Sequence, residues 1–268
     1  MNKKKIRIIL TIIFLIGLSI LIYPLICQVW NSKVSTKAIT AYDEMLKKIE
    51  DYTDMFIKGD NYNKELFNLD YPLIQYKKIP DYNELFNINN TGMIGYISID
   101  KIKVNLPIYH GTSSSVLNVA VGHLEGTSLP IGGKSTHSVL SAHRGLPSAK
   151  LFTNLNKLEI GDIFVITVLD RKLTYMVDNI LIVEPNDIEG LEIIENEDFV
   201  TLITCTPYGL NTHRLLVRGT RIENIKELHL VVTSEAYKID KLIVTLVITI
   251  PILLVLIIYV LFKPVKKD

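Results

Sequence analysis

The chain has 268 residues, of which 48% are hydrophobic and 21% are charged, and its formal net charge is +1. This near-neutral balance gives no sign of nucleic-acid binding, and the apolar content is higher than an ordinary soluble domain needs. The apolar excess lies at the two ends, and roughly two hundred residues of mixed composition between them are enough for one domain with a sizeable core.

Two uncharged stretches, Ile8–Ile26 and Leu242–Phe262, each have about the ~20 residues that a helix needs to cross a bilayer. The basic start of the chain also fits a cleavable signal peptide. However, the first stretch is long for such a signal and no small-residue cleavage site follows it, so we expect an uncleaved anchor. Positive charge flanks both spans on their terminal sides, in Lys3, Lys4, Lys5, Arg7, Lys263, Lys266 and Lys267. Both termini are therefore predicted to be cytoplasmic and the central domain extracellular.

After the first span, apolar residues at helical spacing predict an amphipathic helix from Ser35 to about Phe56. The following segment, Gly59–Asn90, is rich in Asn, Asp and Tyr and is interrupted by two prolines. It is long for a connection without structure of its own, and such segments are usually functional lids or linkers. Its many aromatic side chains argue against simple disorder.

From Met93 onward the pattern changes to short apolar runs separated by turns that contain glycine and proline. These runs predict strands at Ile94–Ile99, Val104–Tyr109, Ser138–Ala142, Ile163–Leu169, Leu173–Leu181, Phe199–Cys205 and Leu215–Ile222. Leu151–Leu158 is expected to be a short helix. Many short strands of this kind are typical of an all-β barrel or sandwich rather than of βαβ units.

The last two predicted strands carry the strongest candidates for chemistry. If they pair as a hairpin, Cys205 at the end of one faces Arg214 at the start of the other. A thiol beside a fixed cation is a plausible activated nucleophile, with the guanidinium to stabilise an oxyanion. The competing interpretations are an inert core cysteine and a surface arginine. Cys27 lies at the membrane edge, so a disulfide to Cys205 is not expected.

A cysteine nucleophile needs an acid–base partner, and His143 is the best candidate because it ends a short apolar strand. His213 is the alternative. Neighbouring residues on a strand point to opposite faces, so His213 faces away from Cys205 if Arg214 faces toward it. This arrangement predicts acyl transfer. The six histidines form no metal-ligand pattern, and we expect neither a metal nor a cofactor.

The segment TLITCTPYGLNTHRLLVRGTR (201–221) closely resembles the signature of sortases. Residues 93–99, 106–112 and 122–162 resemble their class C, pilin-polymerising branch. This resemblance implies a closed eight-stranded β-barrel and a catalytic set of Cys205, His143 and Arg214. It also implies cleavage of a Leu-Pro-x-Thr-Gly-like sorting signal through a thioacyl enzyme, which a lysine of another pilin subunit resolves. The expected setting is the cell membrane of a Gram-positive bacterium.

Class C sortases usually carry a lid with an Asp-Pro-aromatic motif, whereas this chain has Asp70-Tyr71-Pro72 in a different order. One hypothesis is that Asp70 pairs with Arg214 and Tyr71 covers Cys205. The other is that the segment is only a loop.

The expected domain organisation has five parts. They are a tail and anchor (1–30), a helix and lid segment (31–90), the catalytic barrel (91–225), a linker (226–241), and a second span with its basic tail (242–268). Two alternatives to pilin polymerisation remain open. One is a sortase that attaches surface proteins to peptidoglycan, and the other is a non-catalytic, membrane-tethered barrel that binds a peptide.

Overall fold

The structure is a computed structural model that describes residues 3–88, 90–224 and 241–262. It divides into two compact units, one of residues 1–27 and 226–268 and the other of residues 28–225. The predicted linker falls outside the described residues except for Lys241, which begins α5 (Lys241–Phe262). Helix α1 (Lys3–Leu46) contains the first apolar stretch.

Within the described residues, α1 is the one helix long and apolar enough to cross a membrane, over Lys5–Leu46. Helix α5 covers the stretch expected to be the second span, but its described apolar part, Ile248–Ile257, is shorter. A second crossing, and with it the two-pass topology, therefore stays a prediction.

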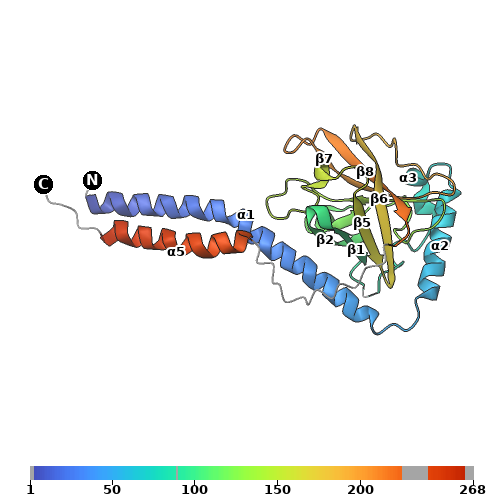
Figure 1. The fold of residues 1–268 in the computed structure, drawn as a ribbon, viewed down its shortest axis with the longest axis horizontal. Coiled ribbons are helices and arrows are strands. Elements are labelled where there is room, and N and C mark those ends of the chain that lie inside the picture. Colours follow the sequence, from blue (N-terminus) through green and yellow to red (C-terminus); the bar gives the residue numbers. More distant parts are fainter. Residues whose placement is uncertain (1–2, 89, 225–240, 263–268) are drawn as a thin grey trace. The chain divides into compact units, whose positions relative to one another are not determined.

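Eight strands close into a barrel in the order β1-β2-β3-β4-β7-β8-β6-β5. Figure 1 shows this β structure in the larger unit. The strands are β1 (Met93–Ile99), β2 (Val104–His110), β3 (Val121–His123), β4 (Thr136–Ser141), β5 (Ile163–Val168), β6 (Arg171–Val183), β7 (Asp198–Thr206) and β8 (His213–Ile222). The pairs β2–β3 and β4–β7 are parallel, and the other pairs are antiparallel. The predicted closed eight-stranded barrel is confirmed, although β3 was not predicted because three residues are too few to show an alternating pattern.

The helical predictions before the barrel were partly wrong. The helix expected over Ser35 to about Phe56 is broken, because α1 ends at Leu46 and α2 runs over Thr53–Phe67. At the break, the Asp51 carboxylate accepts hydrogen bonds from the Thr53 amide and hydroxyl, at 2.8 and 2.6 Å. Such local side-chain bonds compete with a continuing helix.

Two further segments differ from their predictions. The segment Gly59–Asn90 has more regular structure than expected, because it contains the second half of α2, α3 (Pro72–Gln75) and η1 (Tyr76–Lys78). The short helix expected at Leu151–Leu158 is only the 3-10 turn η3 (Leu155–Lys157). The other short turns are η2 (Asp100–Ile102) and α4 (Ser114–Leu117).

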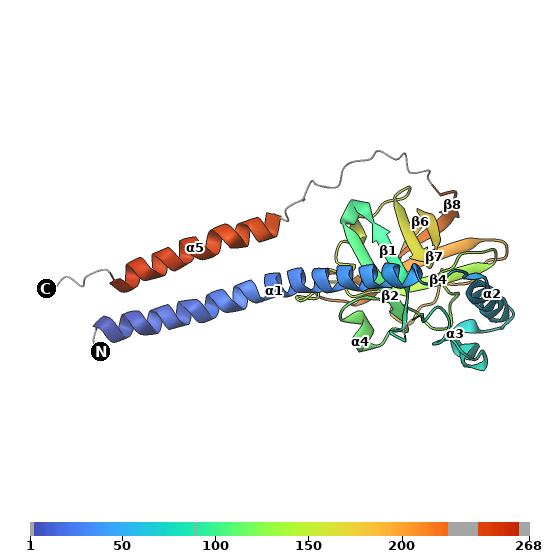
Figure 2. The same cartoon turned by 90° about the horizontal axis from the view of Figure 1, so that it is seen from below.

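The last turns of α1 lie along the barrel, as Figure 2 shows, and a buried tyrosine fixes them there. The Tyr42 hydroxyl donates to the Ile94 carbonyl at 2.8 Å and accepts from the Leu169 amide at 2.9 Å. Both strand-end groups are thereby satisfied, and burial raises the pKa of Tyr42 well above its ordinary value. Helix α2 packs beside the barrel through Phe56, which contacts the buried ring of Phe86.

Strands β1 and β5 approach so closely that only glycine fits at position 95. A Cβ at Gly95 would lie 2.2 Å from the Thr167 carbonyl oxygen.

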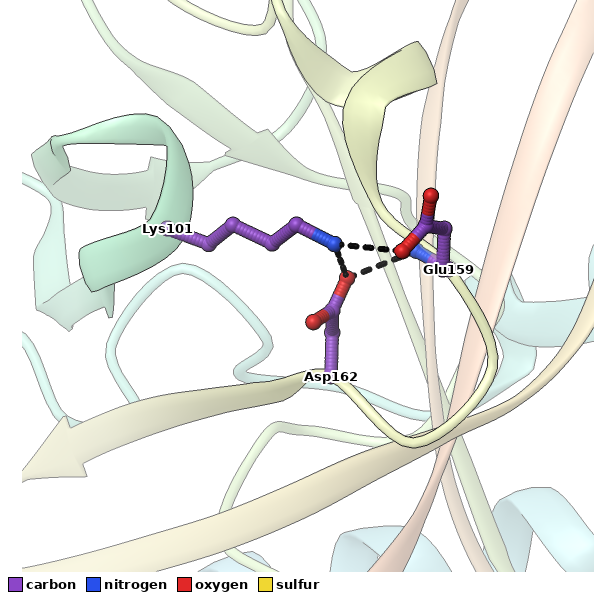
Figure 3. Close-up of polar contacts among 3 residues, drawn as sticks. All are labelled: Lys101, Glu159 and Asp162. Atoms are coloured by element: carbon purple, nitrogen blue, oxygen red, sulfur yellow. Dashed lines mark hydrogen bonds and ion pairs between the residues drawn. The ribbon is translucent and has the colours of Figure 1, made fainter.

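A polar cluster joins the ends of strands β1 and β5 (Figure 3). The Lys101 ammonium lies 2.8 Å from Glu159 Oε2 and 2.7 Å from Asp162 Oδ2, so it ties η2 to the turn that leads into β5.

Candidate active site

Strands β7 and β8 bring Cys205 and Arg214 together, as the hairpin hypothesis predicted. The two residues are directly opposite each other in the antiparallel ladder, and Thr206 is opposite His213. Opposite residues in such a ladder have Cβ atoms about 5 Å apart and on the same face of the sheet. The Cys205 thiol and the Arg214 side chain therefore share one face at the open end of the hairpin, while the next pair points the other way.

The parallel pairing of β4 with β7 brings His143 to the same end of the barrel as Cys205. Ser141 is in register with Ile203, and beyond the strand the Ala142 amide donates to the Ile203 carbonyl at 3.2 Å. The Thr204 hydroxyl then donates to the Ala142 carbonyl at 2.8 Å. These two bonds hold the end of β4 against the end of β7, so the histidine that follows lies beside the strand that carries the cysteine.

The three candidate catalytic residues line one cavity of about 390 Å³. Cys205, His143 and Arg214 are all half-buried, which leaves their functional groups accessible to a substrate. His213 does not line this cavity. It is exposed, and its Nδ1 shares a hydrogen bond of 2.9 Å with the Thr212 hydroxyl. The geometry thus supports His143 rather than His213 as the partner of Cys205.

Arg214 is held by the loop that joins β7 and β8. Its Nη1 donates to the carbonyl oxygens of Asn211 and His213, at 3.3 and 3.2 Å. These two acceptors are uncharged carbonyl groups, so neither contact adds a negative charge next to the guanidinium. A planar cation fixed in this way is suited to stabilise an oxyanion that forms on a carbonyl bound at Cys205.

The rest of the cavity is mostly apolar and is built from several segments. Its lining also includes Thr112, Leu117, Leu124, Ser141, Val183, Pro185, Asn186, Asp187, Ile188, Leu191, Ile203 and Leu216. The stretch Pro185–Leu191, in the connection between β6 and β7, forms one wall that sequence reasoning missed. Its proline, asparagine and glycine indicated only a turn, and nothing in the local sequence placed that turn near Cys205.

Among the described residues of the pre-barrel segment (53–88 and 90), Leu73 of α3 is the one that lines the cavity. Asp70 and Tyr71 do not line the cavity, and Tyr71 is 65% exposed. In the described structure, Arg214 donates hydrogen bonds to backbone carbonyl groups and not to Asp70. The expected contacts of Asp70 with Arg214 and of Tyr71 with Cys205 are therefore not made in this structure.

Helix α3 is fastened to the barrel at the connection that follows β3. The Tyr76 hydroxyl donates to Glu125 Oε2 at 3.0 Å. Next to it, Gly126 has φ +85, a left-handed backbone conformation that favours glycine, and a Cβ there would lie 2.9 Å from Leu73 Cα. Leu73 is thus pressed against the barrel at the mouth of the cavity.

We expect Leu73→Ala to speed alkylation of Cys205 by iodoacetamide. Removing a partly buried leucine contact costs about 1 kcal/mol, which corresponds to about a fivefold larger open fraction of the cavity mouth. Ile74→Ala is the matched control, because Ile74 is 77% exposed and does not line the cavity. Alkylation rates of Leu73→Ala and the control that equal wild type would contradict a covering role for α3. A faster rate only in Asp70→Ala with Tyr71→Ala would instead restore the lid expected from the sequence.

His123 and Glu125, which are close to the cavity, serve to dock the pre-barrel segment. His123 is fully buried and shares a hydrogen bond of 2.7 Å with the Tyr82 hydroxyl through Nδ1. Its Nε2 lies 2.8 Å from the Ser128 carbonyl oxygen. Burial lowers the pKa of His123 to about 4, so it is neutral near pH 7. Because His123 is buried, neutral and hydrogen-bonded through both ring nitrogens, its role is structural rather than that of an acid–base catalyst.

Both cysteines are free. Among the described residues, no group of three or more His, Cys, Asp or Glu side chains could hold a metal ion. The ionisable side chains that line the cavity include the Cys205 thiol, the His143 imidazole, the Arg214 guanidinium and the Asp187 carboxyl group.

Comparisons with known proteins point to one family. Residues 97–222 match the sortase domain family. The structure resembles the crystal structure of sortase C1 from Streptococcus agalactiae, with a TM-score of 0.65 and 46% identity over 70% of this chain and 100% of that one. It also resembles the structure of Clostridium perfringens sortase C with the C-terminal cell wall sorting motif. There the TM-score is 0.62 and the identity 44%, over 71% of this chain and 100% of that one.

The match to sortase A from Streptococcus agalactiae is 28% identical and covers 49% of this chain. It covers 53% of that protein, so the chain spans about half the length of this curated relative. With 46% identity over the whole of a solved sortase C1 and a matching barrel, the family is nevertheless clear. The chain belongs to the sortase family of cysteine transpeptidases, and the solved structures that it resembles are class C sortases.

Proposed function

We propose that this protein is a membrane-anchored, extracellular cysteine transpeptidase of class C that joins pilin subunits. The observation that carries the proposal is the cavity that Cys205, His143 and Arg214 share at one end of the barrel. The substrate would be a Leu-Pro-x-Thr-Gly-like sorting signal. The apolar lining of the cavity suits the leucine and proline of such a signal, and the structural similarity to class C sortases supports the assignment.

In the first half-reaction, the Cys205 thiol gives its proton to His143 and its sulfur attacks the threonine carbonyl carbon of the sorting signal. The new C–S bond moves charge onto the carbonyl oxygen, where the Arg214 guanidinium stabilises it. His143 gives a proton to the glycine amine as the C–N bond breaks, so the glycine-containing fragment leaves neutral. The product is a thioester between Cys205 and threonine.

In the second half-reaction, the ε-amine of a lysine on another pilin subunit attacks the thioester. His143, now without the proton it gave away, accepts one from the incoming amine. The tetrahedral intermediate expels the Cys205 thiolate and leaves an isopeptide bond. Each half-reaction uses the same three side chains, and no cofactor is needed.

The acceptor distinguishes this function from attachment to peptidoglycan, which would use the same residues. The test is to incubate the purified protein with a sorting-signal peptide, a lysine-containing pilin domain and a peptidoglycan stem peptide. We expect mass spectrometry to find the threonine joined to the pilin lysine. Transfer only to the stem peptide would favour wall anchoring, and binding without cleavage would favour a non-catalytic barrel.

A further inference from the structure

Arg144 links the two strand ends that carry the proposed catalytic pair. It directly follows His143, and its Nη1 donates to the hydroxyl of Thr206 at 3.0 Å. Thr206 in turn directly follows Cys205. The Arg144 guanidinium also lies 6.0 Å from the ring centroid of Tyr208, in the loop after the cysteine. One side chain thus bridges the residue after the histidine and the residues after the cysteine.

The surroundings of Arg144 argue against an ordinary stabilising ion pair. Among the described residues it has no carboxylate partner, and its Nε is buried without a hydrogen-bond partner. A buried donor without a partner costs stability. The contacts that Arg144 does make, to Thr206 and Tyr208, join the two strand ends, and we assign its role from them.

The short segment around Arg144 is fixed from the other side as well. The His143 carbonyl accepts from the Phe152 amide at 3.1 Å, and the Gly145 amide donates to the Thr153 hydroxyl at 3.1 Å. Gly145 also packs closely on Tyr208, since a Cβ there would lie 2.9 Å from Tyr208 Cε2. The backbone on either side of Arg144 is therefore fixed by hydrogen bonds. Its side chain can then hold the end of β4 at a set distance from the end of β7.

We propose that Arg144 is a positioning residue, which sets the placement of His143 relative to Cys205 through its bridge to Thr206 and Tyr208. This inference rests on the proposed function, in which these two side chains exchange protons with the substrate. A misplacement of about 1 Å between reacting groups costs about 100-fold in rate. Because the bridge does not touch the reacting atoms, its loss should lower turnover more than substrate binding.

The test compares five single variants and the double variant Arg144→Ala/Thr206→Val of the full-length protein in cleavage of a sorting-signal peptide. Arg144→Ala removes the bridge, and Arg144→Lys keeps the charge but lacks the planar fork. Thr206→Val removes the acceptor while keeping its shape, and Thr206→Ser keeps the hydroxyl. Arg171→Ala is the control, because it removes a guanidinium that lies 3.4 Å over the Phe56 ring and outside the cavity lining. The readouts are kcat, KM, Tm and the pH profile of Cys205 alkylation.

We expect Arg144→Ala to lower kcat about 10- to 100-fold with KM within about twofold, and to change the pH profile of alkylation. Thr206→Val should act in the same direction, Thr206→Ser should stay near wild type, and Arg144→Lys should not recover full activity. In the double variant the two losses should not multiply, because both remove one bridge. Arg171→Ala should lower Tm alone.

Two results would overturn the positioning role. One is an Arg144→Ala protein that behaves like Arg171→Ala, with lower Tm but unchanged kcat and pH profile. The other is a double variant whose loss is the product of the single losses. A failure of the proposed function would look different, because wild type would then bind the peptide without cleaving it, or Cys205→Ala would cleave it as fast as wild type.

Discussion

Replacing Cys205 by alanine is expected to abolish cleavage of a sorting-signal peptide while leaving the barrel folded. The thiol is the proposed nucleophile, and removing a protease nucleophile lowers kcat about a millionfold. The side chain is small and half-buried in the cavity wall, so its loss should cost little stability. Peptide cleavage followed by chromatography, together with thermal unfolding, measures both effects.

The other cysteine provides the control for this result. Cys27 lies in α1 and does not line the cavity, so Cys27→Ala should cleave the peptide at the wild-type rate. Residual cleavage by Cys205→Ala at a rate near wild type would show that the thiol is not the nucleophile. Equal losses in both cysteine variants would point to a general effect on the protein.

The second large effect is expected at the histidine. His143→Ala should lower kcat about 10²- to 10⁴-fold, the usual contribution of a positioned general acid–base group. His213→Ala should change it by less than about twofold, because His213 is exposed and lies outside the cavity. The same peptide assay measures both variants, and a pH–rate profile shows whether the loss involves proton transfer.

This pair of variants separates the two histidines that the sequence leaves as candidates. A large loss in His213→Ala with normal activity in His143→Ala would reverse the assignment. In that case the cavity would not be the reaction site, because among the described histidines only His143 shares it with Cys205.

Much of the barrel could be predicted because its strands show their burial in the sequence. The runs that became β7 and β8 alternate or stay apolar between clear turns, and their ladder puts Cys205 opposite Arg214 as expected. Strand β3 could not be found this way, since its three residues are recognised only by their pairing with β2 and β4. The break after Leu46 could not be predicted because the apolar spacing continues across it, and the local hydrogen bond from the Thr53 amide to Asp51 leaves no mark on that spacing.

The candidate site was predictable where it depends on neighbouring strands and not where it depends on packing between distant segments. His143 was found because a strand end carries it. By contrast, Leu73 was not distinguished from Asp70 or Tyr71, because only the docking of α3 beside Gly126 decides which side chain faces the cavity. Arg144 gave no signal in the sequence, since its bridge to Thr206 spans 62 residues.

The central claim is that Cys205 carries a covalent acyl intermediate, and intact-protein mass spectrometry tests it most directly. The purified protein is mixed with a sorting-signal peptide in the absence of an acceptor amine, quenched in acid and digested for peptide mapping. We expect an added mass equal to the peptide up to its threonine, located on Cys205 and absent from Cys205→Ala. An adduct on another residue, or cleavage by Cys205→Ala without any adduct, would contradict it.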